Sequence, residues 1–405
     1  MAEGGVRGAA QREKLRVLTL NNISGKGLQR LPAGQYQTDT AFDVPDAILV
    51  RSHNMHDLEV PSSVKAIGRA GAGTNNIPVA KMSARGVPVF NTPGANANAV
   101  KELVLAAMLI AARNLTDAVR FVDTVEGSDE EVNRVVEGAK KNFAGVELPN
   151  RTLGVIGLGK IGSLVADAAI RLGMNVWGYD PNITVDAAWS LPAQVHKAQS
   201  IEQLLRKCEF LSVHVPLLDS TRDLIDAGRL ALMQPGAVVL NFARDGVVNN
   251  EAVLAALEEG RLKNYVCDFP SVALKRSNRV IAFPHLGAST REAEENCAVM
   301  VVDQVRDYLE HGNIRNAVNF PSVSMVRESP YRLGVTNSNV PNMVGQISTA
   351  VAEAGLNIHN MINKSRDDMA YTLVDADSPV PASVIEAIRN IAGVLTVRYL
   401  PLEGE

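Results

Sequence analysis

Cysteine is scarce in this chain of 405 residues, which contains only Cys208, Cys267 and Cys297. Three scattered cysteines are too few for a disulfide framework or a zinc site, and they fit a reducing compartment. A strong excess of one charge is also missing, because 40 Lys and Arg residues face 44 Asp and Glu residues, for a net charge of −4. The balance gives no global reason to bind nucleic acid or an anionic membrane, so an anionic ligand would need a local cationic pocket.

Long hydrophobic runs are missing as well. The longest, residues 103–112, is too short to span a bilayer, which takes about 20 residues. Residues 1–14 lack the apolar core of a secretory signal and predict a flexible tail. We therefore expect a cytoplasmic protein that binds neither nucleic acid nor membrane. Hydrophobic residues make up 46% and charged residues 21% of the chain, a globular composition, and the length predicts two or three domains of roughly 150 residues each.

Short β-type runs alternate with helical stretches along most of the chain. A first series leads into a helix predicted over 98–114, and a second series begins at residue 152. The strands expected in the first series are 15–20, 46–52, 64–71 and 87–93, and those of the second are 152–157, 175–180, 209–216, 237–243, 265–269 and 279–283. Alternating apolar strands and helices predict an α/β fold with two doubly wound parallel sheets, one Rossmann-type and one flavodoxin-like.

The remaining segments complete the predicted domain plan. Residues 121–141 and 291–312 predict helices, and the polar segment 316–330, which carries two prolines, predicts a linker. From residue 331 the order strand, helix, strand, strand, helix, strand predicts a ferredoxin-like βαββαβ unit. The expected domains are a substrate-binding domain from 1–95 and 285–325, a nucleotide-binding domain over 96–284, and the small domain 330–405.

A glycine motif follows the first strand of the second series. Gly157, Gly159 and Gly162 have the spacing Gly-x-Gly-x-x-Gly and open a helix. Such glycines let the backbone approach a pyrophosphate, which the helix N-terminus stabilises with amide groups and a positive dipole. Asp180 ends the next strand, where an acid bonds the ribose hydroxyls of NAD and repels the 2′-phosphate of NADP. The motif predicts an NAD site, and a tight turn without a ligand is the alternative.

Three polar residues follow three successive strands of the second series. Arg244 lies in "NFARDGVVNN", Asp268 in "YVCDF" and His285 in "FPHLGAST". Ligands of open α/β sheets bind at the carboxyl ends of the strands. The guanidinium of an arginine matches a carboxylate, and histidine titrates near neutral pH, which suits proton transfer. Each residue alone has a surface or capping role as its alternative, so their common sheet edge carries the prediction of a catalytic site.

Two arginines have equivalent places in the first series. Arg51 and Arg69 end adjacent strands, and Arg69 runs into the glycine-rich loop "AGAGTNN" (70–76), whose amides can receive an anion. Each arginine alone is typical of a surface, but the pair predicts an anionic substrate. His214 also ends a strand, with either a cofactor-lining or a packing role. No spacing of His, Cys, Asp and Glu indicates a metal site, and we expect none.

Together these motifs closely resemble the D-2-hydroxyacid dehydrogenase family. The matching stretches include "GRAGAGTNN", "LGVIGLGKIG", "NFARDGVV" and "FPHLGASTREAEENCA", and the resemblance extends over nearly the whole chain from about residue 15. Residues 330–405 are similar to the regulatory ACT domain that such enzymes often carry. The resemblance implies an NAD-dependent oxidoreductase that acts on a small hydroxy acid and forms homodimers or homotetramers.

The resemblance also implies roles for the matching residues. His285 would take the C2 hydroxyl proton as a hydride leaves for NAD, and Arg244 would hold the substrate carboxylate and polarise the keto oxygen. Arg51 and Arg69 would hold a phosphate, with the loop amides near the carboxylate. The implied cofactor residues are Gly157, Gly159, Lys160, Ile161, Gly162, Asp180, His214, Val215, Pro216, Phe242, Ala243, Asp268, Gly287 and Ala288. The implied substrate residues are Arg51, Ser52, Arg69, Gly71, Ala72, Gly73 and Asn75.

Three asparagines of the ACT-like unit match positions that bind serine in related enzymes. They are Asn337, Asn339 and Asn357, so the resemblance implies L-serine as an effector. Asn342 replaces the glycine that the strand–helix turn of such a unit usually contains. Because asparagine tolerates a left-handed backbone better than most residues, we expect the turn to be kept.

One departure from the family lies between Asp268 and His285. Family members usually carry a glutamate here that orients and charges the histidine, but "CDFPSVALKRSNRV" (267–280) contains no acid after Asp268. Without a carboxylate partner, we expect the imidazole to have a lower pKa and a less fixed ring. Glu102 and Glu292 are the candidate replacements.

Three functions stay open on the sequence. The first is oxidation of D-3-phosphoglycerate to 3-phosphohydroxypyruvate at the start of L-serine biosynthesis, which the arginine pair and the ACT-like unit favour. The second is reduction of glyoxylate or hydroxypyruvate. The third is an NAD-responsive binding protein similar to the transcriptional corepressors of this family, which the missing glutamate keeps open.

Overall fold

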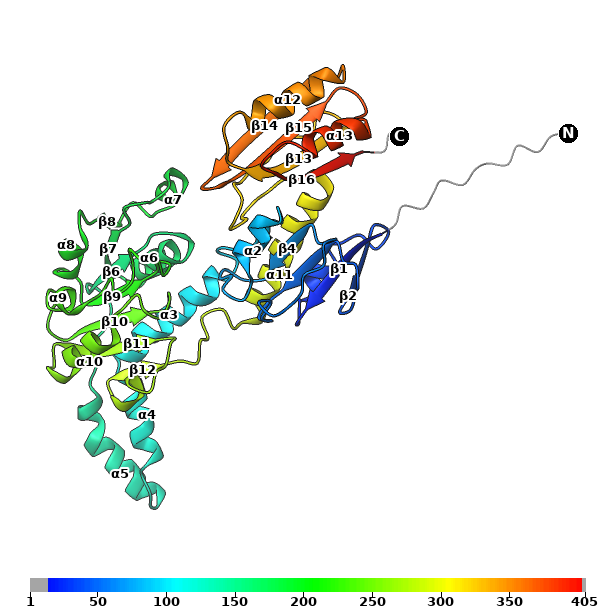
Figure 1. Ribbon diagram of the computed structural model, residues 1–405. Coiled ribbons are helices and arrows are strands. Elements are labelled where there is room, and N and C mark those ends of the chain that lie inside the picture. The colour runs from blue at the N-terminus through cyan, green and yellow to red at the C-terminus, as the bar shows by residue number, and fades with distance from the viewer. Residues whose placement is uncertain (1–13, 403–405) are drawn as a thin grey trace. The chain divides into compact units, whose positions relative to one another are not determined.

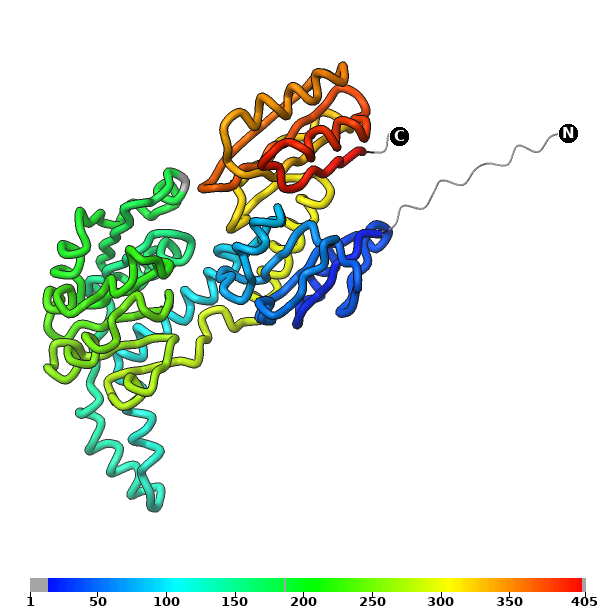
Figure 2. Tube along the Cα trace, viewed as in Figure 1, coloured from blue at the N-terminus to red at the C-terminus, as the bar shows by residue number. Residues whose placement is uncertain are grey.

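The computed structural model describes residues 14–402, apart from the side chain of Asp186, so all but the last residue of the predicted flexible tail lies outside the described residues. The described chain forms two compact units. One contains the residues up to Ala95 together with those from Glu294 onward, and the other is Asn96–Ala293 (Figure 1). In the chain trace, the blue beginning and the yellow-to-red end therefore belong to the same unit (Figure 2).

The first unit contains a five-stranded parallel sheet in the order β2-β1-β3-β4-β5. Alternate side chains of a strand point to opposite faces, so Val17 and Leu49 pack under α11 while Leu18 and Ile48 pack under α2. Gly68 is required here, because a Cβ would lie 2.6 Å from a methyl group of Val301 on α11. The elements are β1 (Leu15–Leu20), α1 (Gly25–Leu28), β2 (Tyr36–Asp39), β3 (Ala47–Val50), β4 (Ala66–Arg69), α2 (Val79–Ala84), β5 (Val89–Phe90) and α11 (Arg291–His311).

The second unit contains a seven-stranded parallel sheet in the order β12-β11-β10-β9-β6-β7-β8. Helices α3 and α6 cover one face, and α8 and α10 cover the other. The strands are β6 (Thr152–Ile156), β7 (Asn175–Tyr179), β8 (His196–Lys197), β9 (Phe210–Val213), β10 (Ala237–Asn241), β11 (Leu262–Cys267) and β12 (Val280–Ala282). The helices are α3 (Ala97–Ala112), α4 (Leu115–Asp123), α5 (Asp129–Ala139), α6 (Lys160–Arg171), α7 (Val185–Trp189), α8 (Ile201–Leu205), α9 (Ala227–Leu230) and α10 (Asn250–Glu258), with short 3₁₀ turns at Lys140–Phe143 and Leu274–Arg276.

The end of the chain forms a four-stranded antiparallel sheet in the order β14-β15-β13-β16. Its elements are β13 (Tyr331–Ser338), α12 (Met343–Glu353), β14 (Ile358–Arg366), β15 (Met369–Ala376), α13 (Ala382–Arg389) and β16 (Val394–Pro401). Val374 and Ala376 pack under the two helices, while Tyr371 and Leu373 face the other way and join the core around α11. The predicted fold class is confirmed: an α/β protein with two parallel sheets and a βαββαβ unit.

The segment predicted as a linker, 316–330, connects α11 to β13 without a helix or strand, but part of it is buried. Phe320, Val323 and Met325 are buried in the core around α11, and Val323 forms a β-bridge with Ile314. These apolar residues are separated by polar ones and by prolines, so the segment looks polar on average although one side of it is buried.

The single helix predicted over 121–141 is also wrong in detail. Helix α4 ends at Asp123, Gly127 adopts a φ of 125°, and Ser128 begins α5 with a capping box to Glu131. The 103–112 run lies inside α3, whose buried face packs against the seven-stranded sheet. Within 14–402, no helix combines the length and apolar character that crossing a membrane requires.

Candidate active site

The glycine motif forms a tight cradle between β6 and α6. Gly157 has a φ of 87°, and a Cβ there would lie 2.6 Å from the carbonyl oxygen of His214. A Cβ at Gly162 would lie 1.9 Å from the carbonyl oxygen of Gly157. No described atom lies within 4 Å of the place where a Gly159 Cβ would stand, at the N-cap of α6. The loop is thus closed on its protein side and open at the helix N-terminus, which fits a bound pyrophosphate. Lys160 and Ile161 are the first residues of that helix.

Asp180 ties the end of β7 to this cradle. One carboxylate oxygen accepts a hydrogen bond from the backbone N–H of Leu158 at 2.9 Å, and the other accepts one from Asn182 at 3.0 Å. Each carboxylate oxygen has a further lone pair, so Asp180 can also accept hydrogen bonds from two ribose hydroxyls.

His214 directly follows β9. Its Nε2 lies 2.8 Å from the Ser212 hydroxyl, and burial lowers the pKa of the imidazole to about 4. A neutral buried imidazole cannot serve as the acid of a reaction near neutral pH. Val215 and Pro216 follow it and become progressively more exposed.

Strands β10, β11 and β12 lie side by side and end in register, with Asn241 opposite Cys267 and Cys267 opposite Ala282. The predicted residues Phe242, Ala243, Arg244, Asp268 and His285 therefore share one edge of the sheet. Asn241, which the sequence analysis missed, fixes the first of these turns. Its side chain accepts a hydrogen bond from the N–H of Ala243 and donates one to the carbonyl oxygen of Arg244. A polar residue in the otherwise apolar strand "AVVLN" was the available signal.

Asp268 holds the loop that carries His285. It is 2% exposed, and its two oxygens accept hydrogen bonds of 2.7 Å from the backbone N–H groups of Leu286 and Gly287. His285 itself has a φ of 56°, a left-handed conformation that few non-glycine residues adopt. Two charge-assisted hydrogen bonds directly after it stabilise this strained turn.

The imidazole of His285 is exposed, and its ring meets the ring of Phe269 edge-on with centroids 5.1 Å apart. Within residues 14–402 the imidazole makes no hydrogen bond or ion pair. Glu102 bonds Asn98, and Glu292 lies near Arg291; both glutamate side chains are more than half exposed. The described structure therefore supplies no carboxylate to this ring.

The arginines predicted to bind substrate meet at the ends of β3 and β4. Val50 is opposite Arg69, and the Arg69 Nε donates a hydrogen bond of 3.0 Å to the carbonyl oxygen of Arg51. Gly71 lies directly against the Arg69 guanidinium, where a Cβ would be 1.7 Å from Nη1. An Arg51 Nη lies 2.7 Å from Glu294 of α11, a partner that the sequence analysis missed because it is distant in the chain.

The loop beside these arginines is anchored at several points. The Asn91 side chain donates a hydrogen bond of 2.6 Å to the carbonyl oxygen of Ala72, and the N–H of Thr92 donates one to that of Gly71. The His56 ring bonds the carbonyl oxygen of Asn75, and the N–H of Ser52 bonds the Asn21 side chain. These bonds fix the loop through its carbonyl oxygens, and Gly73 lies at its centre.

Comparison with known proteins identifies the family. Residues 105–287 match the family "D-isomer specific 2-hydroxyacid dehydrogenase, NAD binding domain". A relative from Haemophilus influenzae, D-3-phosphoglycerate dehydrogenase, is 32% identical over 85% of this chain and 83% of its own length. The chain belongs to the D-isomer specific 2-hydroxyacid dehydrogenase family. It is an NAD-dependent oxidoreductase, and the cradle between β6 and α6 belongs to its NAD-binding domain.

Other relatives of this dehydrogenase carry the same name. D-3-phosphoglycerate dehydrogenase of Escherichia coli is 28% identical over 96% of this chain and 98% of its own length. That of Methanocaldococcus jannaschii is 33% identical over 77% of this chain but only 58% of its own length. A solved Thermus thermophilus protein matches 75% of this chain with a TM-score of 0.61 at 26% identity. The NAD⁺-bound 3-phosphoglycerate dehydrogenase of Entamoeba histolytica, at 24% identity and a TM-score of 0.58, shows the same fold over 76% of this chain.

The antiparallel domain of the dehydrogenase contains a small cavity of about 140 Å³ lined by asparagines. Asn337 and Asn339 line it with Asn342 and Asn363, and the Asn337 Oδ1 is buried without a partner among the described residues. Asn357 is not part of its lining and is instead exposed in a turn with Asp377. As expected, Asn342 keeps the turn, with a φ of 64° and a ψ of 14°.

Proposed function

We propose that this dehydrogenase oxidises D-3-phosphoglycerate to 3-phosphohydroxypyruvate with NAD, the first step of L-serine biosynthesis. The observation that carries the proposal is the arginine pair at the ends of β3 and β4, beside the anchored loop 70–76. Two guanidinium groups suit a substrate with a phosphate and a carboxylate. The names of the Haemophilus influenzae and Escherichia coli relatives support the same substrate.

The proposed reaction uses His285 and Arg244. NAD, which the cradle between β6 and α6 would hold, would supply the acceptor for the C2 hydride, and the His285 imidazole would take the proton of the C2 hydroxyl. Arg244 holds the substrate carboxylate. The guanidinium is exposed and hydrogen-bonded only to the adjacent carbonyl oxygen of Ala243 among the described residues, so its other N–H groups are available. We propose three domains. The substrate-binding domain consists of 1–95 and 285–325, the NAD-binding domain is 96–284, and the regulatory domain is 330–405.

Steady-state assays of NADH oxidation test the proposal. We expect 3-phosphohydroxypyruvate to be reduced with a kcat/KM about 100-fold above those of hydroxypyruvate and glyoxylate, because those substrates leave the arginine pair unused. Arg51→Gln or Arg69→Gln should remove most of this preference, whereas Arg30→Gln, an exposed residue paired with Asp303, should not. Equal use of the three substrates would favour a glyoxylate or hydroxypyruvate reductase, for which the partial neutralisation of Arg51 by Glu294 is the supporting observation. If the protein turns over none of the three substrates, the NAD-responsive corepressor-like function would be the remaining hypothesis.

We propose further that L-serine binds in the asparagine-lined cavity. The unpaired Asn337 Oδ1 can accept a hydrogen bond from an ammonium group. Inhibition by serine should weaken at least about tenfold in Asn337→Ala, since a buried hydrogen bond to a charged group is worth roughly 1.5–3 kcal/mol. Unchanged inhibition in this variant would place the effector elsewhere. Asn357→Ala, outside the cavity, is the matched control.

We propose a homodimer, on its own or within a homotetramer, as the working assembly. The helices α4 and α5 bury none of their own residues, and α4 exposes Leu115, Val119 and Val122 by 44–61%. Apolar side chains that find no cover in their own unit suit a second copy of the chain. Sedimentation analysis of Val119→Asp/Val122→Asp should show a smaller assembly than the unmodified protein.

A further inference from the structure

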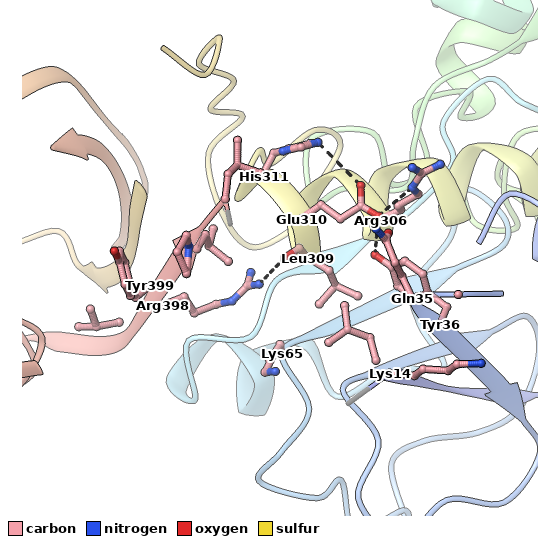
Figure 3. Close-up of a pocket in the computed structure, with 16 residues that line it drawn as sticks. Lys14, Gln35, Tyr36, Lys65, Arg306, Leu309, Glu310, His311, Arg398 and Tyr399 are labelled. Atoms are coloured by element: carbon pink, nitrogen blue, oxygen red, sulfur yellow. Dashed lines mark hydrogen bonds and ion pairs between the residues drawn. The ribbon is translucent and has the colours of Figure 1, made fainter. Parts of the chain in front are cut away.

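A cavity of the first unit is lined by none of the residues proposed for catalysis or substrate binding. It has a volume of about 630 Å³, within the size range of small-molecule sites. Strand β16 forms one wall, the beginnings of β1 and β2 form another, and the last turns of α11 lie between them (Figure 3). A ligand here would contact the antiparallel sheet and the five-stranded parallel sheet at once.

The cavity carries more positive than negative charge. Two of its cations are paired with acids: Lys65 lies 2.7 Å from Asp46, and Arg306 lies 2.9 Å from Glu310. Glu310 also accepts a hydrogen bond of 3.0 Å from Tyr36, as Figure 3 shows, so its carboxylate is already engaged. The two other cations of the lining are Lys14 and Arg398, and neither has a carboxylate partner among residues 14–402.

Arg398 is held in a fixed position, and some of its N–H donors are not used by the protein. Its guanidinium lies 4.4 Å from the centre of the Tyr308 ring, and one N–H group donates to the carbonyl oxygen of Tyr308. A second N–H group donates to the carbonyl oxygen of Leu309 (Figure 3). A guanidinium has five N–H donors, so three remain for a ligand. A cation fixed by stacking and by two carbonyls needs little reordering to bind an anion.

The rest of the lining is largely apolar. Leu309 and Val397 are already buried, at 4% and 9% exposed, whereas Leu15 and Leu400 are half-buried and Leu402 is 47% exposed, and these last three reach the solvent. Inorganic phosphate would satisfy the cations but leave these side chains in contact with water. An apolar group attached to the anion would cover them, at roughly 25 cal/mol per Å² of surface removed from water.

We propose that this cavity binds a small organic anion, in which one acidic group is attached to an apolar body. The acidic group contacts Arg398 and Lys14, and the apolar body covers the leucine side chains that reach the solvent. The site is separate from the asparagine-lined cavity and does not depend on the identity of the substrate.

Dye binding to the full-length protein tests the charge requirement. The probe is 8-anilinonaphthalene-1-sulfonate, with saturating NAD⁺ present to occupy the nucleotide site. Its neutral counterpart, N-phenyl-1-naphthylamine, has the same apolar body without the sulfonate, and inorganic phosphate is an anion without a body. We expect one saturable site for the sulfonate, with a Kd about 10-fold below that of the neutral dye, and no competition by phosphate below about 100-fold higher concentration. Equal affinity for the two dyes would overturn the proposal.

Matched variants test the location. Gly34 lines the cavity and no described atom lies within 4 Å of its Cβ position, so Gly34→Trp can fill the space without a backbone clash. Gly25 is equally open but lies outside the lining, so Gly25→Trp is the control. We expect the sulfonate Kd to rise at least about 10-fold in the first variant only. Unchanged affinity in Gly34→Trp would place the dye elsewhere.

Charge variants give a second measure that does not depend on filling the cavity. Lys14→Gln removes the lysine of the lining that has no carboxylate partner among residues 14–402, and it should raise the sulfonate Kd by about 5-fold, with a smaller change for the neutral dye. Lys81→Gln makes the same type of change at an exposed position of α2 outside the cavity. An equal effect of the two substitutions would mean that only general surface charge is involved.

Discussion

At the residue scale, the position of His285 is set by its backbone more than by its ring. The Asp268 carboxylate stabilises the left-handed φ of His285, because it accepts hydrogen bonds from the backbone N–H groups of the next two residues, Leu286 and Gly287. Family members usually orient the ring with a glutamate, and the described residues offer none. Asp268 is therefore inferred to be a positioning residue for the histidine in addition to its predicted place near the nicotinamide.

Substitution Asp268→Asn tests this role. An amide can accept only one of the two backbone hydrogen bonds and leaves the other N–H unpaired, at a cost of about 1–3 kcal/mol. We expect kcat to fall about 10- to 100-fold as the histidine shifts, while KM for the keto acid changes little. Asp245→Asn, an exposed carboxylate after β10, is the control. A normal kcat in Asp268→Asn would contradict the positioning role.

The buried imidazole of His214 makes stability depend on pH. Its pKa falls from 6.5 to about 4 on folding, because burial disfavours the charged form. The unfolded chain therefore binds a proton here at a higher pH than the folded protein. The stabilisation is complete above pH 6.5 and is lost as the pH falls towards 4.

Thermal unfolding of His214→Gln checks this dependence. The substitution removes the titrating group, so the drop in Tm between pH 7 and pH 5 should be smaller in the variant than in the unmodified protein. Replacement of the exposed His53 by Gln should leave the drop unchanged. A parallel fall in His214→Gln and in the unmodified protein would show that this histidine is not buried in its neutral form.

At the element scale, the segment 316–330 shows where composition misleads. Alternation of strands and helices predicted both parallel sheets and the βαββαβ unit, because their apolar residues recur with a regular period. The residues 316–330 have no such period, yet Phe320 and Val323 are fully buried. Arg244, Asp268 and His285 follow strands that are adjacent in the sheet, as the strand ends predicted. Glu294, by contrast, pairs with Arg51, which is distant in the chain and which no local pattern records.

Truncation of Phe320 measures how much this segment contributes. Because the ring is fully buried in the core around α11, Phe320→Ala should reduce the free energy of unfolding by about 3–5 kcal/mol. Val326 lies six residues further on and is 81% exposed, so Val326→Ala should change stability by less than about 0.5 kcal/mol. Denaturant unfolding monitored by circular dichroism would compare the two variants, and similar values would contradict a contribution of this segment to the core.

At the scale of the whole molecule, the antiparallel domain is joined to the five-stranded sheet by a shared core and a buried ion pair. Arg332 and Asp375 are both fully buried and form two hydrogen bonds of 2.6 and 2.7 Å. Arg332 also donates to the carbonyl oxygens of His311, Met325 and Val326. The pair therefore links β13 and β15 to the end of α11.

Removal of one partner of the Arg332–Asp375 pair should lower the free energy of unfolding far more than removal of both partners. Asp375→Ala leaves a buried guanidinium without a counter-charge, which we expect to cost about 3–5 kcal/mol of unfolding free energy. The double variant Arg332→Met/Asp375→Leu should recover much of this loss, since an apolar pair of similar volume is often tolerated. Asp167→Ala, which breaks the exposed pair with Arg171, is the control and should change stability by less than about 1 kcal/mol. A double variant no more stable than Asp375→Ala would contradict the argument.

The shared core also constrains the order in which the chain can fold during synthesis. Val17, Leu49 and Phe90 pack in one core with Val301, Tyr371 and Leu373. The first ninety or so residues therefore leave the ribosome long before their packing partners exist, whereas Asn96–Ala293 is continuous and can fold as soon as it has emerged. We expect the NAD-binding unit to be the first structured part of the nascent chain, and the apolar strands β1 to β5 to be the part that most needs chaperones until translation ends.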